Sequence, residues 1–120
     1  MANPNIVNVS SILGITDTFA LDTTLTTTLV TAASDKVYKI NSIFVANIDG
    51  TNAANVTIAY NDQTNTRAIA STISVPADAS LSIIDKNNSF YLTEGDSIEG
   101  GASADGDLVC MISYEILDDA

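Results

Sequence analysis

The sequence predicts an all-β chain, and three observations carry that prediction. Apolar and polar residues alternate with period two through most of the 120 residues, and β-branched residues are enriched in the alternating runs. Turn residues recur about every 8–12 positions. About eight strands in a chain of this length are typical of a two-sheet antiparallel β-sandwich, of jelly-roll or immunoglobulin-like type. We expect one such domain over residues 19–120, preceded by an N-terminal arm or edge strand over residues 1–18.

The N-terminal third has the weakest strand pattern. Alternation within residues 19–31 predicts one strand somewhere in that range. Residues 2–15 lack a clean period but carry six large aliphatic residues: Ile6, Val7, Val9, Ile12, Leu13 and Ile15. Burying such a side chain is worth about 1.5–3 kcal/mol, so we expect the segment to be covered. We predict that these six residues form a partner interface, in preference to an intrachain strand; Pro4 suits an arm or edge strand.

The clearest central strand runs from residue 37 to residue 47. Strict alternation places one apolar set, Tyr38, Ile40, Phe44 and Ala46, on one face and a second set, Val37, Ile43 and Val45, on the other. Asp49-Gly50 then starts a loop, alternation resumes over residues 56–60, and residues 61–65 form the next turn. The strand over residues 68–75 ends at Pro76, which has no N–H to donate.

The C-terminal part alternates most regularly. Short strands are expected over residues 81–84, 90–92 and 98–103, with turns between them. The last strand places its apolar residues on one face: Leu108, Cys110, Ile112, Tyr114 and Ile116. No helix of more than two turns is indicated.

The charge balance limits the partners. Four Lys and Arg residues stand against 15 Asp and Glu residues, a net charge of −11. Nucleic-acid affinity comes largely from clustered cations, so we expect no nucleic-acid partner and no electrostatic membrane anchor. No apolar run approaches the ~20 residues of a membrane span. Charged residues make up only 16% of the chain, which favours a surface covered by neighbours in an assembly.

The residue inventory also argues against catalysis. Histidine is absent, and Cys110 is the only cysteine, so the usual general base, zinc ligands and disulfides are missing. Two loops carry oxygen ligands of the kind that bind calcium, one with Asp49, Thr51, Asn52 and Asn55 and the other with Asp105 and Asp107, but solvated turns are favoured at both. We expect no enzyme, no cofactor and no metal site. Residues 1–5 show no signal-peptide pattern, which favours synthesis in a cytoplasm.

Three stretches together carry a resemblance to known proteins. Val37-Tyr-Lys-Ile-Asn-Ser-Ile-Phe-Val-Ala-Asn-Ile-Asp-Gly50 leads to Asn55-Val-Thr-Ile58, and Val75-Pro-Ala-Asp-Ala-Ser-Leu-Ser-Ile-Ile84 follows. The third is Phe90-Tyr-Leu-Thr-Glu-Gly-Asp-Ser-Ile98 with Ala102-Ser103. In order and spacing they resemble small β-sandwich virion proteins of tailed phages that infect marine bacteria and cyanobacteria, over residues 37–117.

The resemblance implies a structural role and no catalytic residues. The leading hypothesis is a capsid decoration or cement protein that stabilises the shell, forms a homo-oligomer with a trimer preferred, and contacts the major capsid protein on the virion surface after synthesis in the host cytoplasm. The alternative is a tail or fibre module that binds host surface carbohydrate. Attachment to a shell should depend on apolar and backbone contacts, because the chain has few cations.

Overall fold

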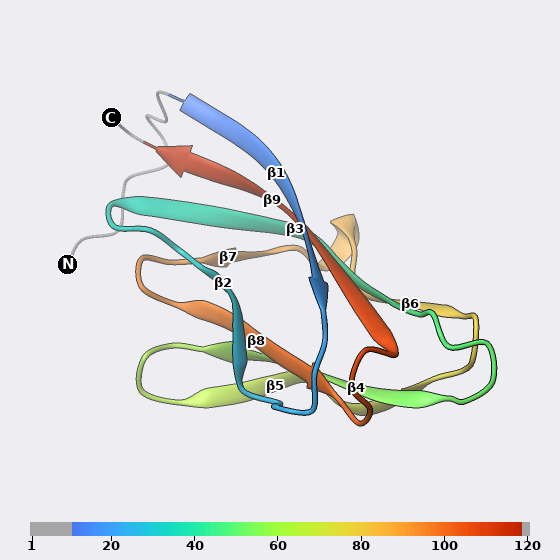
Figure 1. Cartoon of the computed structure of the whole chain (residues 1–120). Coiled ribbons are helices and arrows are strands. Elements are labelled where there is room, and N and C mark those ends of the chain that lie inside the picture. Colours follow the sequence, from blue (N-terminus) through green and yellow to red (C-terminus); the bar gives the residue numbers. More distant parts are fainter. Residues whose placement is uncertain (1–10, 119–120) are drawn as a thin grey trace.

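The computed structural model describes residues 11–118, which form nine strands in two antiparallel sheets (Figure 1). The strands are β1 (Ser11–Ala20), β2 (Thr27–Thr31), β3 (Lys36–Asn47), β4 (Ala54–Asn61), β5 (Thr66–Val75), β6 (Ser80–Ile84), β7 (Phe90–Leu92), β8 (Ser97–Ala102) and β9 (Leu108–Asp118). A 3-10 turn, Lys86–Asn88, lies between β6 and β7. The expected two-sheet β-sandwich is confirmed.

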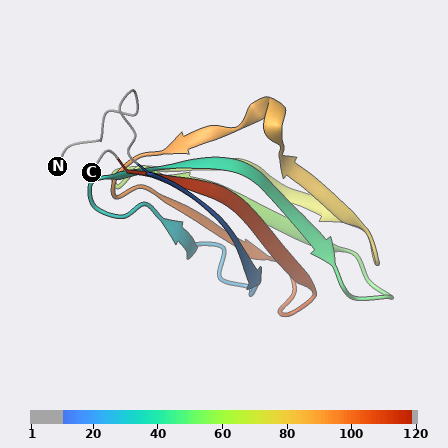
Figure 2. The same ribbon diagram turned by 90° about the horizontal axis from the view of Figure 1, so that it is seen from above.

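The strand order is that of a jelly roll. One sheet has the order β1-β9-β3-β6, with β7 also paired to β3, and the other has the order β2-β8-β4-β5. β6 and β7 both run antiparallel to β3 and follow one another along it, so they are two halves of one strand that the 3-10 turn interrupts. Figure 2 shows the two layers from above, with β1 and β2 on the same side of the molecule.

The core lies between the two sheets. Its fully buried side chains come from both layers and include Ile40, Ile43, Ile58, Ile98 and Ile112. Their burial follows from period-two alternation, which sends every second side chain of each strand inward. Tyr38 and Tyr114 stack in this core with ring centroids 5.2 Å apart.

β3 departs from the predicted faces. Its register with β9 shifts between Ile40 and Ser42, which places a β-bulge at Asn41. The extra residue reverses the alternation, so that Ile43 and Val45 join Tyr38 and Ile40 in the core, whereas Phe44 is left half-buried on the opposite face. The prediction that Phe44 and Ala46 share a face with Tyr38 was therefore wrong.

The N-terminal region also differs from the prediction. Residues 11–18, predicted to form an arm or edge strand, belong to the edge strand β1, which pairs with β9 along its whole length and is therefore an intrachain strand, the less favoured of the two alternatives. The expected strand within residues 19–31 is shorter, because β1 ends at Ala20 and β2 begins only at Thr27. Between them the Asp22 carboxylate accepts hydrogen bonds from the Thr24 N–H (3.0 Å) and the Thr27 hydroxyl (3.2 Å), and this turn carries the chain from one sheet to the other.

β9 follows the predicted alternation along its whole length, and Ile116, the last residue of the predicted face, packs partly buried against the core. Leu108, Cys110, Ile112 and Tyr114 are buried in the core, as expected. Near the end of the strand Leu117 is buried as well, opposite Ile12 of β1 and Val37 of β3.

Candidate interaction surface

β1 forms one edge of the five-stranded sheet and carries half of the predicted interface residues. Ile12 and Leu13 are 61% and 58% exposed, whereas Ile15 is half-buried against the core. Ile6, Val7 and Val9 lie outside the described residues. The structure therefore brings three of the six predicted residues together on one edge strand.

The main-chain groups of β1 alternate between β9 and the open edge. The Leu21 N–H donates to the Leu108 carbonyl (2.9 Å) in continuation of the β1–β9 register. Because main-chain groups alternate along an antiparallel ladder, odd-numbered residues of β1 face β9. The even-numbered residues from Ile12 to Ala20 therefore direct their N–H and C=O groups to the outer side of β1. Among residues 11–118, no strand pairs with that side.

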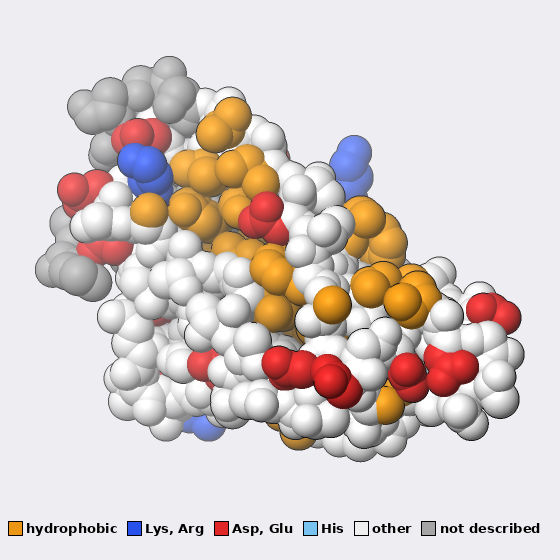
Figure 3. Space-filling model, in the orientation of Figure 1, with side chains coloured by type: hydrophobic (Ala, Val, Ile, Leu, Met, Phe, Trp, Pro, Cys, Tyr) orange, Lys and Arg blue, Asp and Glu red, His pale blue; other side chains and the backbone are white. Residues whose placement is uncertain are grey.

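Apolar side chains line the side of the sandwich where β1 and β2 lie. Phe19 and Ile15 of β1 and Leu29 of β2 pack against the core but are only partly buried, and Leu25 is 46% exposed. Figure 3 shows a band of hydrophobic side chains along the course of β1. We call Leu13, Ile15, Phe19, Leu25 and Leu29 the edge band. These residues continue the core toward solvent on this side of the molecule.

The outer face of the β1-β9-β3 layer adds a second apolar area. Three strands contribute to one cross-strand row, in which Phe44 lies opposite Met111 and Met111 lies opposite Thr18. Phe44 and Met111 are half-buried. The next cross-strand row on this face is polar: Thr16 and Ser42 lie opposite Ser113, and the hydroxyl oxygens of Thr16 and Ser113 lie 3.0 Å apart.

Buried carboxylates gather instead at the turns of the opposite sheet. Asp96 accepts hydrogen bonds from the hydroxyls of Tyr60 (2.6 Å) and Thr93 (2.7 Å) and from the Gln63 amide (3.0 Å). Burial acts to raise the pKa of Asp96, but the three hydrogen bonds outweigh it and the pKa is lowered. Burial and the bond to Asp96 raise the pKa of Tyr60. This network joins the β4–β5 turn to the β7–β8 turn.

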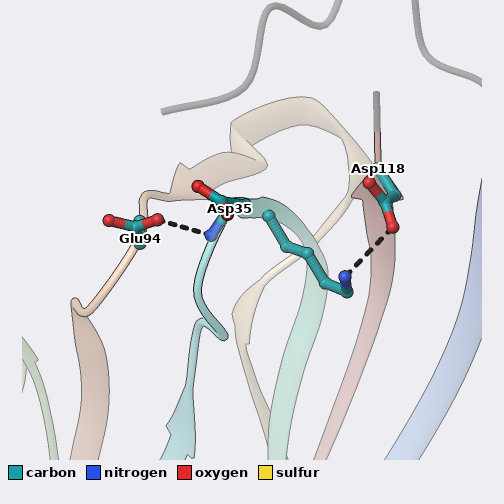
Figure 4. Close-up of polar contacts among 4 residues, drawn as sticks. Asp35, Glu94 and Asp118 are labelled. Carbon is teal, nitrogen blue, oxygen red and sulfur yellow. Dashed lines mark hydrogen bonds and ion pairs between the residues drawn. The ribbon is translucent and has the colours of Figure 1, made fainter. Parts of the chain in front are cut away.

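Two further acidic contacts hold the same end of the sandwich. Figure 4 shows the Glu94 carboxylate, which accepts a hydrogen bond from the Asp35 N–H, and the Lys36–Asp118 ion pair, with 3.0 Å between Nζ and Oδ2. On β8, Glu99 is buried and accepts a hydrogen bond from the Asn61 amide at 2.8 Å. These carboxylates tie strands and turns together.

The two loops weighed for calcium meet at the other end of the molecule. Asp49 accepts a hydrogen bond from the Thr51 N–H (2.8 Å), which lowers its pKa. Burial, repulsion from Asp49 and a side-chain hydrogen bond to Asp49 raise the pKa of Asp107. Within the described part of the chain, no group of three or more His, Cys, Asp or Glu residues is arranged to hold a metal ion.

The single cysteine lies deep in the core. Cys110 is 1% exposed, and burial raises the pKa of its thiol to about 12. Its neighbour on the same face, Tyr114, donates a hydrogen bond to the Asp17 carboxylate of β1 (2.7 Å), and burial raises the pKa of this tyrosine. A neutral, buried thiol is a packing group and not a nucleophile.

No known family model matches the chain, and no curated protein matches it. Within the described residues no helix is long and apolar enough to cross a membrane. Ile12 and Leu13 were predicted as interface residues from the sequence, whereas Phe19, Thr16 and Thr18 were not predicted to lie on the same open strand. The alternation of Thr16, Thr18 and Ala20 with Ile15, Asp17 and Phe19 was the available signal for a strand here.

Proposed function

We propose that the protein is a non-enzymatic structural component of a tailed-phage virion, a capsid decoration or cement protein that self-associates and binds the major capsid protein at the capsid surface. The observation that carries the proposal is the exposed apolar edge of the sandwich, where Leu13 stands in solvent on the same face of β1 as the partly buried Ile15 and Phe19, and Ile12 stands in solvent on the opposite face. Exposed apolar patches of this kind mark protein–protein interaction sites.

The chemistry of the chain supports an assembly role. The described cations are few, and Lys36 is already engaged with Asp118. Several acidic residues accept intramolecular hydrogen bonds at turns, so they serve the scaffold. The remaining means of attachment are apolar contact and main-chain pairing, and β1 offers both.

The role is tested in purified particles of the parent phage by mass spectrometry. A decoration protein should be present at a copy number comparable to that of the major capsid protein. A copy number that is a small fraction of the capsid protein's would contradict the proposal and favour the tail or fibre module, for which Tyr91, 47% exposed on β7, is the available aromatic surface.

A matched pair of variants tests whether the β1 edge is needed for assembly on particles that lack the protein. The double substitution Ile12→Asp with Leu13→Asp places charges on the open edge, and we expect it to reduce particle binding at least tenfold. Ile73→Asp makes the same kind of change at a 40% exposed residue of β5, and we expect wild-type binding. Equal binding of both variants would show that the β1 edge plays no part in assembly on the particle.

A further inference from the structure

The edges of the two sheets differ in how ready they are to accept another strand. β2 and β6 have five residues each, and both have a register shift. β5 has ten residues but two register shifts against β4. β1 also has ten residues, and its register with β9 is uninterrupted.

β1 also lacks the residues with which proteins protect an open edge. Natural edge strands are blocked by Lys, Pro or bulges, because unpaired N–H and C=O groups template pairing with another chain. Residues 11–20 contain no Lys, Arg or Pro and no bulge, and Gly14 and Thr16 are exposed. The one charged residue, Asp17, accepts the hydrogen bond from Tyr114. Within the described residues, β1 is therefore the one long, regular and unblocked edge.

We propose that β1 of one copy pairs antiparallel with β1 of a second copy, which joins the two five-stranded sheets across a two-fold axis. The inference deepens, and rests on, the self-association in the proposed function. The partner is a second copy of this chain because β1 is complementary to itself in one antiparallel register. The positions of Asp17 and of the apolar residues of β1 determine that register.

The register is set by three requirements. Outward main-chain groups belong to even-numbered residues, so even residues must face even residues. With Thr16 opposite Thr16, every outward N–H and C=O from Ile12 to Ala20 gains a partner. The same register places Leu13 opposite Phe19 and Ile12 opposite Ala20, so that apolar side chains meet.

Neighbouring registers are worse. A shift in one direction centres the pairing on Asp17 and places two carboxylates opposite each other, which is destabilising. A shift in the other direction centres it on Ile15, takes the partner of Ala20 beyond the described residues and places Asp17 opposite Leu13. In the chosen register Asp17 lies opposite Ile15 and keeps its bond to Tyr114. The apolar edge bands of both copies then cover one another beside the axis.

A disulfide trap tests the register directly. Directly opposed, hydrogen-bonded residues of an antiparallel pair have Cα atoms about 5.5 Å apart, within the range that a disulfide spans. We expect Thr16→Cys to form a covalent dimer under mild oxidation. Thr18→Cys is the matched control and should stay largely uncrosslinked, because Thr18 lies opposite Gly14. Cys110 is 1% exposed and does not compete. Equal crosslinking of both variants, or of neither, would overturn the register.

Mass measurement tests the pairing itself. By light scattering we expect the wild-type chain to have twice its 12.5 kDa mass and to dissociate on dilution. Thr18→Pro removes one outward N–H and should give the monomer mass, whereas Thr18→Val, which keeps the N–H, should stay dimeric. Circular dichroism checks that both variants are folded, and Leu13→Lys, at an exposed residue, provides a second disruption that leaves the backbone unchanged.

A monomer at all concentrations would overturn the pairing; it would be the result if another segment of the chain covered β1. A trimer, the oligomer preferred from the sequence, would overturn it as well, because isologous pairing closes as a dimer. These measurements use the purified chain alone. If the purified chain does not dimerise but particles contain many copies of it, the pairing is wrong and the virion role stands. If the purified chain dimerises but particles contain few copies of it or none, the dimer stands and the decoration role is wrong.

Discussion

β1 and β5 are edge strands of equal length, yet they present very different surfaces. β5 carries Arg67, has two register shifts against β4 and is followed by Pro76. Its Thr72 has a φ of 55°, in the left-handed region that a β-branched residue rarely adopts. β1 has none of these features and pairs regularly with β9. The difference shows that an edge is closed by irregularity and charge, and that strand length alone does not decide whether it accepts a partner.

The largest expected difference is between a residue of β5 that supports folding stability and a residue of β1 that supports self-association. Val75 of β5 is fully buried, whereas Leu13 of β1 is exposed. We expect Val75→Ala to lower the free energy of unfolding by about 2 kcal/mol through lost burial and an added cavity. Leu13→Ala should change it by about 0.5 kcal/mol or less in the monomer and weaken self-association. Denaturant titrations at protein concentrations well below the dimer dissociation constant measure the free energy of unfolding of both variants. A comparable loss of this free energy for the two variants would contradict the assignment of Leu13 to a surface.

A second contrast depends on pH and concerns the β4–β5 side. The pKa of Asp96 is lowered in the folded protein, so its contribution to stability is present above the unfolded pKa of about 4 and is lost as pH falls through the folded value. We expect Asp96→Asn to cost about 1–2 kcal/mol at pH 7, from weakened hydrogen bonds to a charged group. The difference from the wild type should shrink as pH falls below about 4.

Asp107 provides the opposite control for that experiment. Its pKa is raised, so the charged form is disfavoured by folding and its penalty grows as pH rises through the folded pKa. Asp107→Asn should therefore be slightly more stable than the wild type at pH 7 and equal to it in acid. If both variants shifted stability in the same direction at pH 7, the two hydrogen-bonding environments would have been assigned wrongly.

The smallest effects come from backbone substitutions in the two edges. A Cβ at Gly14 of β1 would meet nothing within 4 Å, so Gly14→Ala should stabilise the protein by about 0.4–1 kcal/mol. Thr72→Gly in β5 should also stabilise it, by up to about 1 kcal/mol, because it relieves a left-handed conformation. Gly101→Ala is the counterexample, since its Cβ would lie 2.6 Å from the Thr24 carbonyl oxygen, and we expect it to destabilise. Thermal melts rank the three variants.

Strands could be predicted from the sequence wherever local alternation decides the structure. β9 is the best example, because period two alone places Leu108, Cys110, Ile112 and Tyr114 on one face. The reversal at Asn41 could not be predicted, because a bulge is defined by the pairing of β3 with β9 and leaves no pattern in β3 itself. The N-terminal region is divided between two sheets at the turn that Asp22 stabilises. The sequence does not show that the Thr24 N–H and the Thr27 hydroxyl donate hydrogen bonds to Asp22, so this turn could not be predicted.

Part of the candidate interaction surface could also be predicted from the sequence and part could not. Exposed aliphatics such as Ile12 and Leu13 could be singled out because an unpatterned apolar segment must be covered. The open side of β1 could not be predicted, because being an edge is a property of strand order: β1 is last in its sheet only because β9 returns to lie between it and β3. The alternation of main-chain groups at Thr16 and Thr18 then follows from that order.

Amide hydrogen exchange resolved by residue tests the open edge most directly. In the dimer we expect slow exchange at Gly14, Thr16 and Thr18, comparable to that of Ile15 and Asp17, whose N–H groups face β9. Dilution to the monomer should make the even-numbered amides exchange fast while the odd-numbered ones stay protected. Even-numbered amides that exchange fast at every concentration, or that stay protected in the monomer, would contradict the account that β1 is an open edge completed by a second copy.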